Sequence, residues 1–273
     1  MTWLACLPYW RQTVRGRQPV IDGENKSQFK TLQASWNGPN NVVARVTTRQ
    51  GGVSNKPFDK FNLADHVGDE PHLVLQNRQM LAASVGPELH FQWLRQQHGM
   101  RVVQADDCDE LPAADALISK QAGIVCCVLS ADCLPIFLAS EQGDEVAVIH
   151  AGWRGLAQGI VPITIDHMTT PAQQILLWLG PAIGPCHFEV GTEVRSAFVE
   201  NTQFEYDESC FKSTPEDGKY MADLYAIAKN QAYAAGVEDI SGGNYCTYCD
   251  VERFYSYRRD GVTGRMASLI YIT

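Results

Sequence analysis

The length, composition and charge of this chain exclude several classes of protein. Its 273 residues are 45% hydrophobic and 19% charged, which is typical of a globular protein with room for one large domain or two small ones. Its 22 Lys and Arg stand against 31 Asp and Glu, and the net charge of −9 disfavours nucleic acids and anionic membranes as partners, because both bind clusters of basic residues.

The N-terminal part of the chain differs from the rest. Residues 1–35 combine mixed charge with scattered apolar residues and no sustained period, so we predict an N-terminal extension, in part disordered. From Trp36 onward the pattern becomes that of a folded domain, which we expect to span residues 36–273.

Strand-like and helix-like segments alternate along this expected domain. Six apolar runs have the length of strands: residues 42–48, 124–130, 135–139, 145–149, 175–179 and 266–272. Four segments have helical spacing, the first with Pro71 in its first turn and the last followed by Gly236: residues 70–85, 156–168, 190–200 and 221–235. Because these segments alternate without internal repeats or a linker, we predict a single α/β domain with a mixed sheet.

The cysteines indicate a reducing compartment. The chain has nine, an odd number, and Cys126 and Cys127 lie inside an apolar run where reduced thiols act as small hydrophobes. The short apolar run at residues 3–10 is followed by arginines rather than a cleavage site, so we expect no signal peptide and a cytoplasmic protein. No stretch approaches the roughly 20 apolar residues of a membrane span, and no apolar surface stripe stands out, so we expect a monomer.

Common nucleotide and hydrolase motifs are missing from the sequence. It contains no G-x-G-x-x-G, no P-loop and no G-x-S-x-G, so the dinucleotide, NTP and serine-hydrolase interpretations lose their main support. A small anionic substrate remains compatible with the acidic chain, because local arginines matter more than net charge.

Three segments place a metal ligand in a loop beside a predicted strand. His98 lies between Gln and Gly, Cys133 lies between two strands, and His150 directly follows a strand. Functional groups in α/β sheets gather at such strand ends. Two imidazoles and one thiolate suit Zn²⁺, and three protein ligands leave the fourth position for water or substrate. The sequence therefore predicts an open, catalytic zinc site.

Other segments allow two interpretations each. The pair Cys246 and Cys249 forms a C-x-x-C, either redox-active or half of a structural zinc site, but without a second such pair we favour ordinary thiols. Residues 254–260 hold two arginines beside aromatics, either a phosphate or ring site or a solvated turn. Arg49, in a Gly-rich loop, either binds an anion, which we favour, or closes a hairpin.

Nine segments stand out in order along the chain: 47–54 (TTRQGGVS), 61–63 (FNL), 67–69 (VGD), 77–78 (NR), 97–99 (QHG), 131–135 (ADCLP), 150–155 (HAGWRG), 179–185 (LGPAIGP) and 254–265. Together they resemble the YfiH family, also labelled laccase-domain or polyphenol-oxidase-like proteins, and the similarity covers roughly residue 36 to residue 273. Residues 1–35 match nothing in the family. In the family the Cys246/Cys249 pair is less regular.

The resemblance implies a fold and an activity. The fold is an α/β layered sandwich with mixed sheets, with zinc at the positions matching His98, Cys133 and His150. The activity is phosphorolysis of adenosine, inosine and methylthioadenosine, and deamination of adenosine; some bacterial members are linked to editing of cell-wall precursors. Nucleosides and phosphate would then be the partners.

Phosphorolysis needs an anion held against the ribose. We predict that residues of the matching motifs bind substrate or phosphate: Arg49, Asn62, Arg154 and Arg258. Tyr255 or Trp153 is a candidate for stacking on the base. Zinc deaminases pair the metal with a carboxylic acid as proton shuttle; Asp132 is adjacent to Cys133, but the shuttle stays unassigned.

Three alternatives remain open. A copper polyphenol oxidase is disfavoured because the seven histidines form no His-x-His pair, although Cu²⁺ could replace zinc at the same ligands. A metal-free hydrolase could use Cys133 as nucleophile and His150 as base on an amide of a peptidoglycan precursor. A non-catalytic module could use zinc as a structural clasp, which a fourth ligand such as Cys186 or His187 would support.

Overall fold

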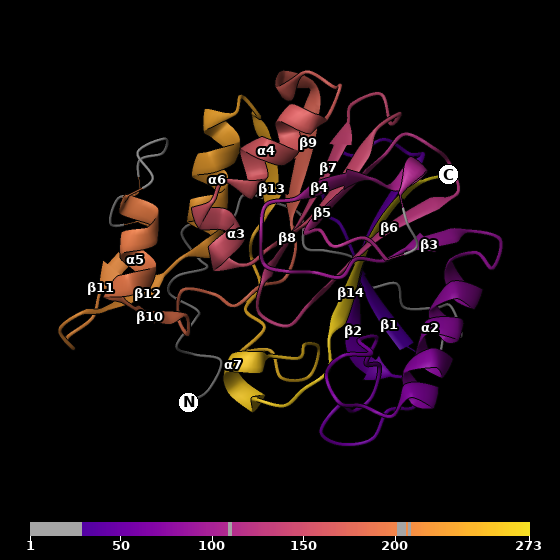
Figure 1. The fold of residues 1–273 in the computed structure, drawn as a ribbon, viewed down its shortest axis with the longest axis horizontal. Coiled ribbons are helices and arrows are strands. Elements are labelled where there is room, and N and C mark those ends of the chain that lie inside the picture. Colours follow the sequence, from indigo (N-terminus) through magenta and orange to yellow (C-terminus); the bar gives the residue numbers. More distant parts are fainter. Residues whose placement is uncertain (1–28, 109–110, 201–205, 207–208) are drawn as a thin grey trace.

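Two packed β-sheets form the centre of the molecule, with helices on both outer faces (Figure 1). The computed structural model describes residues 29–108, 111–200, 206 and 209–273. The first sheet runs in the order β13 (Asp239–Gly242), β9 (Ile175–Leu179), β7 (Leu134–Ser140), β8 (Val146–Ala151), β5 (Ala116–Ser119), β4 (Val102–Gln104). The second runs β1 (Phe29–Gln33), β2 (Val42–Gly51), β14 (Met266–Ile272), β6 (Ile124–Ser130), β3 (His90–Gln92). Both contain parallel and antiparallel pairs, so the predicted layered α/β sandwich with mixed sheets is confirmed.

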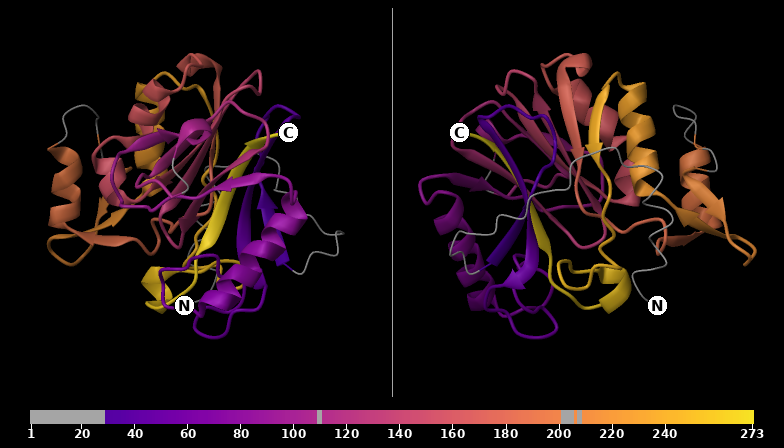
Figure 2. Two further views of the ribbon diagram at one scale, coloured as in Figure 1. Left: turned by 45° about the vertical axis from the view of Figure 1, so that its right-hand side comes forward. Right: turned by 180° about the vertical axis from the view of Figure 1, so that it is seen from behind.

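Helices cover the outer face of each sheet, as the two further views show (Figure 2). The six-stranded sheet packs against α3 (Trp153–Ala157), α4 (Ile160–His167) and α6 (Leu224–Ala234), and the five-stranded sheet against α2 (Pro71–Val85). At one side, a small sheet of β10 (Glu189–Gly191), β12 (Lys219–Ala222) and β11 (Phe211–Ser213) packs with α5 (Thr192–Val199). The remaining short elements are η2 (Ala105–Asp107), η3 (Ala172–Gln174) and α7 (Tyr257–Asp260).

Three hydrophobic clusters fill the three spaces between these layers. Alternate residues of β7 point to opposite faces: Ile136 packs under the helices, and Phe137 packs between the two sheets. In β6, Val128 faces the other sheet, and Cys127 and Leu129 pack with Leu81 of α2. Because the central strands are buried on both faces, their sequences are continuous apolar runs rather than alternating apolar and polar residues.

The structure corrects several predicted boundaries. The predicted helix 156–168 is two helices, because Gly159 adopts a left-handed conformation (φ 82°) between α3 and α4. The predicted helix 190–200 begins as strand β10, and the predicted helix 221–235 begins at Leu224 after the N-cap Asp223, whose carboxylate accepts two backbone N–H bonds.

The start of the domain also differs from the expectation. Residues 29–33 were assigned to the extension, yet they form β1 and pair with β2. The remainder of the predicted extension, up to residue 28, lies outside the described residues. No helix in the part of the chain that the structure describes is long and apolar enough to cross a membrane.

Asn77 on α2 holds the loop that follows β2. Its buried carboxamide donates to Ser54 Oγ and to the carbonyls of Lys60 and Asn62, and accepts from the N–H of Val53. These bonds tie the loop to the helix and so hold Asn62 in place.

Replacing Asn77 with alanine is expected to lower the free energy of unfolding by about 3 kcal/mol or more, because several buried partners lose their bonds at about 1–3 kcal/mol each. Urea denaturation measures the loss, with Gln76→Ala on the exposed face of the same helix as the matched control. Equal stability of the two variants would contradict this role for Asn77.

Candidate active site

The register of three strands brings the predicted ligands together at one end of the six-stranded sheet. In β7 and β8, which are antiparallel, Pro135 is opposite His150, so Cys133, the residue before β7, lies beside the end of β8. In β5 and β8, also antiparallel, Ala116 is opposite Ile149, so Asp115 lies beside His150 and accepts its backbone N–H at 2.7 Å. His150, which the sequence placed in a loop, is the fifth residue of strand β8.

Side-chain donors of His98, Cys133 and His150 lie within 4.8 Å of one another. The rings of His98 and His150 meet edge to face with centroids 4.8 Å apart. His150 is buried, Cys133 is half-buried and His98 is exposed, so the cluster opens to solvent on the His98 side. The arrangement is therefore a three-donor site with one accessible side.

Asp115 organises this cluster, although it is not among the site residues predicted from the sequence. Its buried carboxylate accepts backbone N–H bonds from Gln97, His98 and Gly99 and accepts the Nδ1–H of His150 at 2.8 Å. Burial alone would raise its pKa, but the hydrogen bond and charge of His150 hold the pKa of the Asp115 carboxyl below its usual value. Because Nδ1 of His150 is committed to Asp115, Nε2 is left to face Cys133.

The loop that carries His98 adopts an unusual backbone conformation. His98 has φ 57°, in the left-handed region that non-glycine residues rarely occupy. The three N–H bonds to Asp115 hold the loop in this conformation. A non-glycine residue held at positive φ by a buried carboxylate is the kind of local strain found at functional sites.

Cys133 and His150 form an ion pair. Burial alone would raise the pKa of the Cys133 thiol, but the charge and hydrogen bond of His150, with smaller contributions from His98, lower it to about 6. Burial would likewise lower the pKa of His150, but the Cys133 thiolate and the Asp115 carboxylate raise it to about 9. The thiolate is thus the stable form of Cys133 at neutral pH, which is the form that binds metals and acts as a nucleophile.

Gly152 leaves room for the cluster. A Cβ at this position would lie 3.0 Å from Cδ2 of His98 and 3.2 Å from Sγ of Cys133. The backbone conformation of Gly152 (φ −71°, ψ 163°) is accessible to any residue. Glycine is therefore needed here only because a side chain would crowd the donor atoms.

We therefore expect Gly152→Ala to fold with nearly unchanged stability and to lose metal and activity together. The added methyl group pushes His98 away from Cys133, and a displacement of even 1 Å costs about 100-fold in rate. Metal analysis beside thermal unfolding checks this. The control is Gly191→Ala, because Gly191 has an ordinary backbone conformation (φ −87°) and an added Cβ there meets only the flexible end of the Glu193 side chain. A Gly152→Ala variant with a full metal content would contradict the assignment.

Asp132, considered as a proton shuttle, points away from the cluster. Its carboxylate accepts Thr247 Oγ1 at 2.6 Å and the backbone N–H of Arg258 at 2.7 Å. Its own backbone has φ 92°, and its carbonyl accepts the N–H of Ile183 at 2.9 Å. Asp132 therefore joins the Cys133 loop to two other loops rather than offering a proton to a substrate.

The structure adds a cation that the sequence did not indicate. Arg265 is half-buried, and burial lowers the pKa of its guanidinium, while the negative charges of Cys133 and Asp132 act in the opposite direction. Its guanidinium donates to the carbonyls of Thr263 and Gly264. A half-buried arginine in the field of the Cys133 thiolate is suited to binding an anion beside the cluster.

Two predicted phosphate ligands have structural partners. The Arg49 guanidinium donates to the carbonyls of Asp59 and Val251, pairs with the Asp59 carboxylate and lies 4.9 Å from the centre of the Tyr255 ring. Asn62 is fully buried and its Oδ1 accepts the backbone N–H of Arg265. The two residues thus brace neighbouring loops, and Asn62 positions Arg265.

The other two predicted phosphate ligands are exposed near the cluster. Arg154 is in the first turn of α3, four residues after His150, with its guanidinium 4.3 Å from the centre of the Trp153 ring. Arg258 is tied to Asp132 through its backbone, and its guanidinium donates to the Glu189 carbonyl at 2.8 Å.

Tyr255 cannot stack on a bound base. It is fully buried, and its hydroxyl donates to the Phe58 carbonyl at 2.7 Å. Tyr257 is exposed, 61% of its surface, with the Arg265 guanidinium 5.8 Å from its ring centre. Tyr257 and the half-buried Trp153 are therefore the aromatic candidates at this end of the sheet.

Cys186 and His187 do not complete the cluster as a fourth ligand. Both belong to a separate group with Cys246 and Cys249. A structural clasp that uses His98, Cys133, His150 and one of these two residues is therefore not the arrangement observed.

A cavity of about 240 Å³ lies at the opposite end of the same strands. It is lined by residues such as Ser140 and Glu145, beyond the far ends of β7 and β8. The buried Glu145 carboxylate already accepts bonds from Thr169 and Thr170. This cavity is remote from the three donors and has no part in their chemistry.

Comparison with known proteins identifies relatives along almost the whole chain. Residues 43–273 match the family model described as multi-copper polyphenol oxidoreductase laccase. A Pseudomonas aeruginosa protein named purine nucleoside phosphorylase PA4543 is 46% identical over 241 residues, which cover 88% of this chain and 98% of the relative. The Escherichia coli protein named purine nucleoside phosphorylase YfiH is 43% identical over 245 residues, covering 89% and 99%.

Solved structures share the fold. The Neisseria meningitidis protein NMB0706 superposes with a TM-score of 0.83 at 41% identity, covering 89% of this chain and 98% of that one. YlmD from Geobacillus stearothermophilus superposes with a TM-score of 0.83 at 29% identity, covering 93% and 99%. With a family model over most of its length and relatives at 43% and 46% identity, this chain belongs to the YfiH family of laccase-domain proteins.

Proposed function

We propose that this chain is a zinc-dependent purine nucleoside phosphorylase that acts on adenosine, inosine and methylthioadenosine and also deaminates adenosine. The observation that carries the proposal is the open three-donor cluster of His98, Cys133 and His150. Relatives named purine nucleoside phosphorylase, which share nearly their full length with this chain, support the choice of substrate class.

The cluster fits a zinc ion on chemical grounds. One thiolate and two imidazoles are preferred zinc donors, and a site with three protein ligands is typical of catalytic zinc. Asp115 fixes the tautomer of His150, as carboxylates do for histidine ligands in zinc sites. Gly152 keeps the space between the donors open. When bound, zinc would supply positive charge and Lewis acidity at this position and would activate water for deamination.

In phosphorolysis an oxygen of phosphate forms a bond to C1′ of the ribose, the bond from C1′ to N9 of the purine breaks, and the departing base takes up one proton. The phosphate must be held near C1′ against the acidic charge of the chain. Arg265, Arg154 and Arg258 are the cations around the cluster, and together they would bind and orient the anion. Trp153 and Tyr257 would contact the base or ribose.

Product analysis of purified, metal-quantified protein tests the proposal. Adenosine and inosine are incubated with and without phosphate, and free base, ribose 1-phosphate and inosine are measured. Phosphate-dependent release of base supports phosphorolysis, and inosine formed from adenosine supports deamination. No turnover of any nucleoside by folded, zinc-loaded protein would overturn both parts.

A specific observation favours a second candidate, a cysteine hydrolase. Asp115, His150 and Cys133 are linked in series, with the Asp115 carboxylate accepting from the His150 ring and His150 paired to a thiolate of lowered pKa. This is the arrangement of an activated cysteine nucleophile, and an amide of a peptidoglycan precursor would be its substrate. Zinc bound at Cys133 would prevent the thiolate from acting as a nucleophile. Amide hydrolysis that persists after a chelator has removed all metal would therefore favour the cysteine hydrolase.

The histidines do not support a multi-copper cluster. All seven lie among the described residues, but only His98 and His150 share a group of potential metal ligands, and His187 belongs to the other such group. Cu²⁺ at the three-donor cluster would nevertheless bind strongly. Copper-loaded and zinc-loaded protein should therefore be compared in the nucleoside assay.

A further inference from the structure

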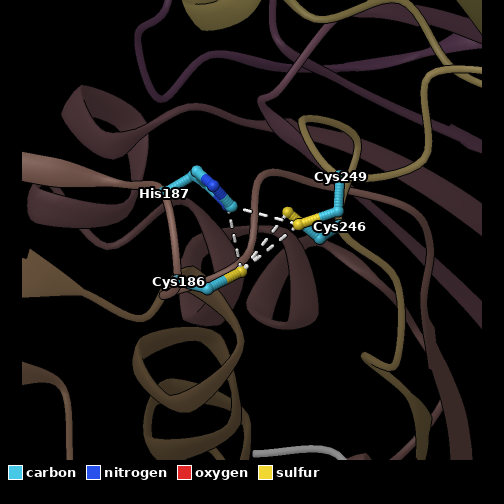
Figure 3. A group of neighbouring side chains, drawn as sticks. All are labelled: Cys186, His187, Cys246 and Cys249. Carbon is cyan, nitrogen blue, oxygen red and sulfur yellow. Dashed lines mark hydrogen bonds between the residues drawn. The ribbon is translucent and has the colours of Figure 1, made fainter. Parts of the chain in front are cut away.

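Four side chains from two distant loops converge at a second point of the structure (Figure 3). Cys186 and His187 follow β9, and Cys246 and Cys249 follow β13. Strands β9 and β13 are parallel neighbours, so the loops after them emerge side by side. The C-x-x-C pair was interpreted as ordinary thiols because no partner is near it in the sequence; the partners come from a loop about 60 residues earlier.

The four donor atoms lie within 4.8 Å of one another, close enough to bind a single metal ion. Cys186 Sγ lies 3.6 Å from Cys246 Sγ and 3.7 Å from Cys249 Sγ. His187 Nδ1 lies 3.3 Å from Cys186 Sγ and 3.2 Å from Cys249 Sγ. Zinc–sulfur bonds of about 2.3 Å in a tetrahedron place sulfur atoms about 3.8 Å apart. The sulfur atoms are much too far apart for a disulfide of about 2.05 Å.

The surroundings orient the donors. The His187 ring stacks on Tyr248 with centroids 4.0 Å apart and planes 13° apart, which fixes the direction of Nδ1. The backbone N–H of Gly184 donates to Cys246 Sγ at 3.3 Å. A Cβ on Gly184 would lie 3.2 Å from the Cys246 Cβ and 3.4 Å from Cys186 Sγ. Glycine at this position therefore lets the loop after β9 pack closely against Cys246. Such supporting contacts are typical of metal sites.

Charge balance also suits a divalent cation. Three thiolates held this close repel one another, and a Zn²⁺ ion reduces their total charge from −3 to −1 while the thiol protons pass to solvent. The Arg259 guanidinium lies against the C-x-x-C turn, where it donates to the carbonyls of Thr247 and Tyr248 at 2.7 and 2.9 Å. Its charge is already paired with the Asp260 carboxylate, so Arg259 supports the shape of this turn rather than neutralising the site.

We propose that Cys186, His187, Cys246 and Cys249 form a second, closed zinc site with a structural role, distinct from the open cluster at Cys133. Four protein ligands of Cys₃His type leave no position for substrate, as in structural zinc sites. The site would join the loop after β9 to the loop after β13.

This cross-link would brace the candidate active site. Thr247, within the C-x-x-C turn, donates its hydroxyl to Asp132 and its backbone N–H to the Ala182 carbonyl. Ile183 donates to the Asp132 carbonyl. Both joined loops therefore contact the residue before Cys133, and loss of the second metal would loosen that support without removing any ligand of the open cluster.

Metal counting on full-length, folded protein tests the proposal. We expect about two zinc ions per chain in the unaltered protein, about one in Cys249→Ala, and about one in the double variant His98→Ala/Cys133→Ala, which loses the open cluster. Cys108→Ser, a change remote from both groups, should retain both. Cobalt substitution of the double variant should give the intense thiolate charge-transfer absorption of a tetrahedral site.

The double variant keeps the test decisive even where Cys249→Ala fails to fold. A folded double variant that binds neither zinc nor cobalt would overturn the proposal, as would a disulfide between Cys186 and Cys246 or Cys249 in unreduced protein. These outcomes do not depend on whether the open cluster is a phosphorylase site, because they count metal and thiols rather than turnover.

Discussion

Replacing Cys133 with alanine is expected to lower phosphate-dependent release of purine by about 1,000-fold or more. The change removes the only thiolate of the open cluster and with it the charge that pairs with His150. Metal-ion catalysis contributes several kcal/mol of transition-state stabilisation, and about 1.4 kcal/mol corresponds to a tenfold change in rate. The rate constants for inosine cleavage at saturating phosphate, beside zinc content, measure the effect.

The matched control for this change is Cys108→Ser, which alters a cysteine away from both metal groups and should keep full activity. The second zinc ion should remain in Cys133→Ala, so the metal content should fall by about one ion rather than to zero. If the variant lost one zinc ion but retained the rate of the unaltered protein, zinc bound at Cys133 would not be required for phosphorolysis.

Changing Asp115 to asparagine should weaken both the fold and the metal site. The carboxylate accepts three backbone N–H bonds and one from His150, and an amide offers only one acceptor atom to these four donors. Removing one member of a buried ion pair costs about 3–5 kcal/mol. Loss of the carboxylate partner of a histidine ligand costs about 10–100-fold in metal affinity. Urea denaturation and competition with a zinc chelator measure the two effects.

Asp144→Asn is the control for Asp115→Asn. Asp144 is an exposed carboxylate that accepts Ser140 Oγ at 2.5 Å at the opposite end of the sheet, so its loss should cost less than about 1 kcal/mol and leave zinc affinity unchanged. If Asp115→Asn bound zinc as tightly as Asp144→Asn did, Asp115 would be a loop anchor and not a support of the metal ligands.

Much of the fold is predictable from the sequence because its central strands are buried on both faces. Ile124–Ser130, Ile175–Leu179 and Met266–Ile272 appear as apolar runs with clear ends, and all three are strands of the predicted length. The strands that the sequence analysis missed, such as β5 and β10, have three or four residues and gain their stability from pairing. Local patterns carry little information about such elements.

The three donors of the open cluster were foreseeable because strand ends locate functional groups in α/β sheets. Asp115 was not, although a signal exists: it is a lone carboxylate next to the apolar run of β5, and a buried charge of this kind needs partners. Arg265 gave no signal, because its relation to Cys133 arises only when β14 packs between β2 and β6.

The same limit explains the predictions for Arg49 and for the cysteine pair. A Gly-rich loop with Arg49 is compatible with anion binding, and only the folded structure shows the carbonyls and carboxylates that take up its donors. The C-x-x-C pair looked incomplete because its other ligands follow a strand that is a neighbour in space and not in sequence.

The most direct test of the open zinc site is a metal titration of the phosphorylase reaction. Protein stripped of metal is reloaded with zinc in steps, and inosine cleavage in phosphate is followed together with the zinc bound. The account predicts no measurable cleavage without metal, and a rate that rises in proportion to occupancy of the His98, Cys133 and His150 cluster. Full activity in the metal-free protein would contradict it and would favour Cys133 as a nucleophile activated by His150.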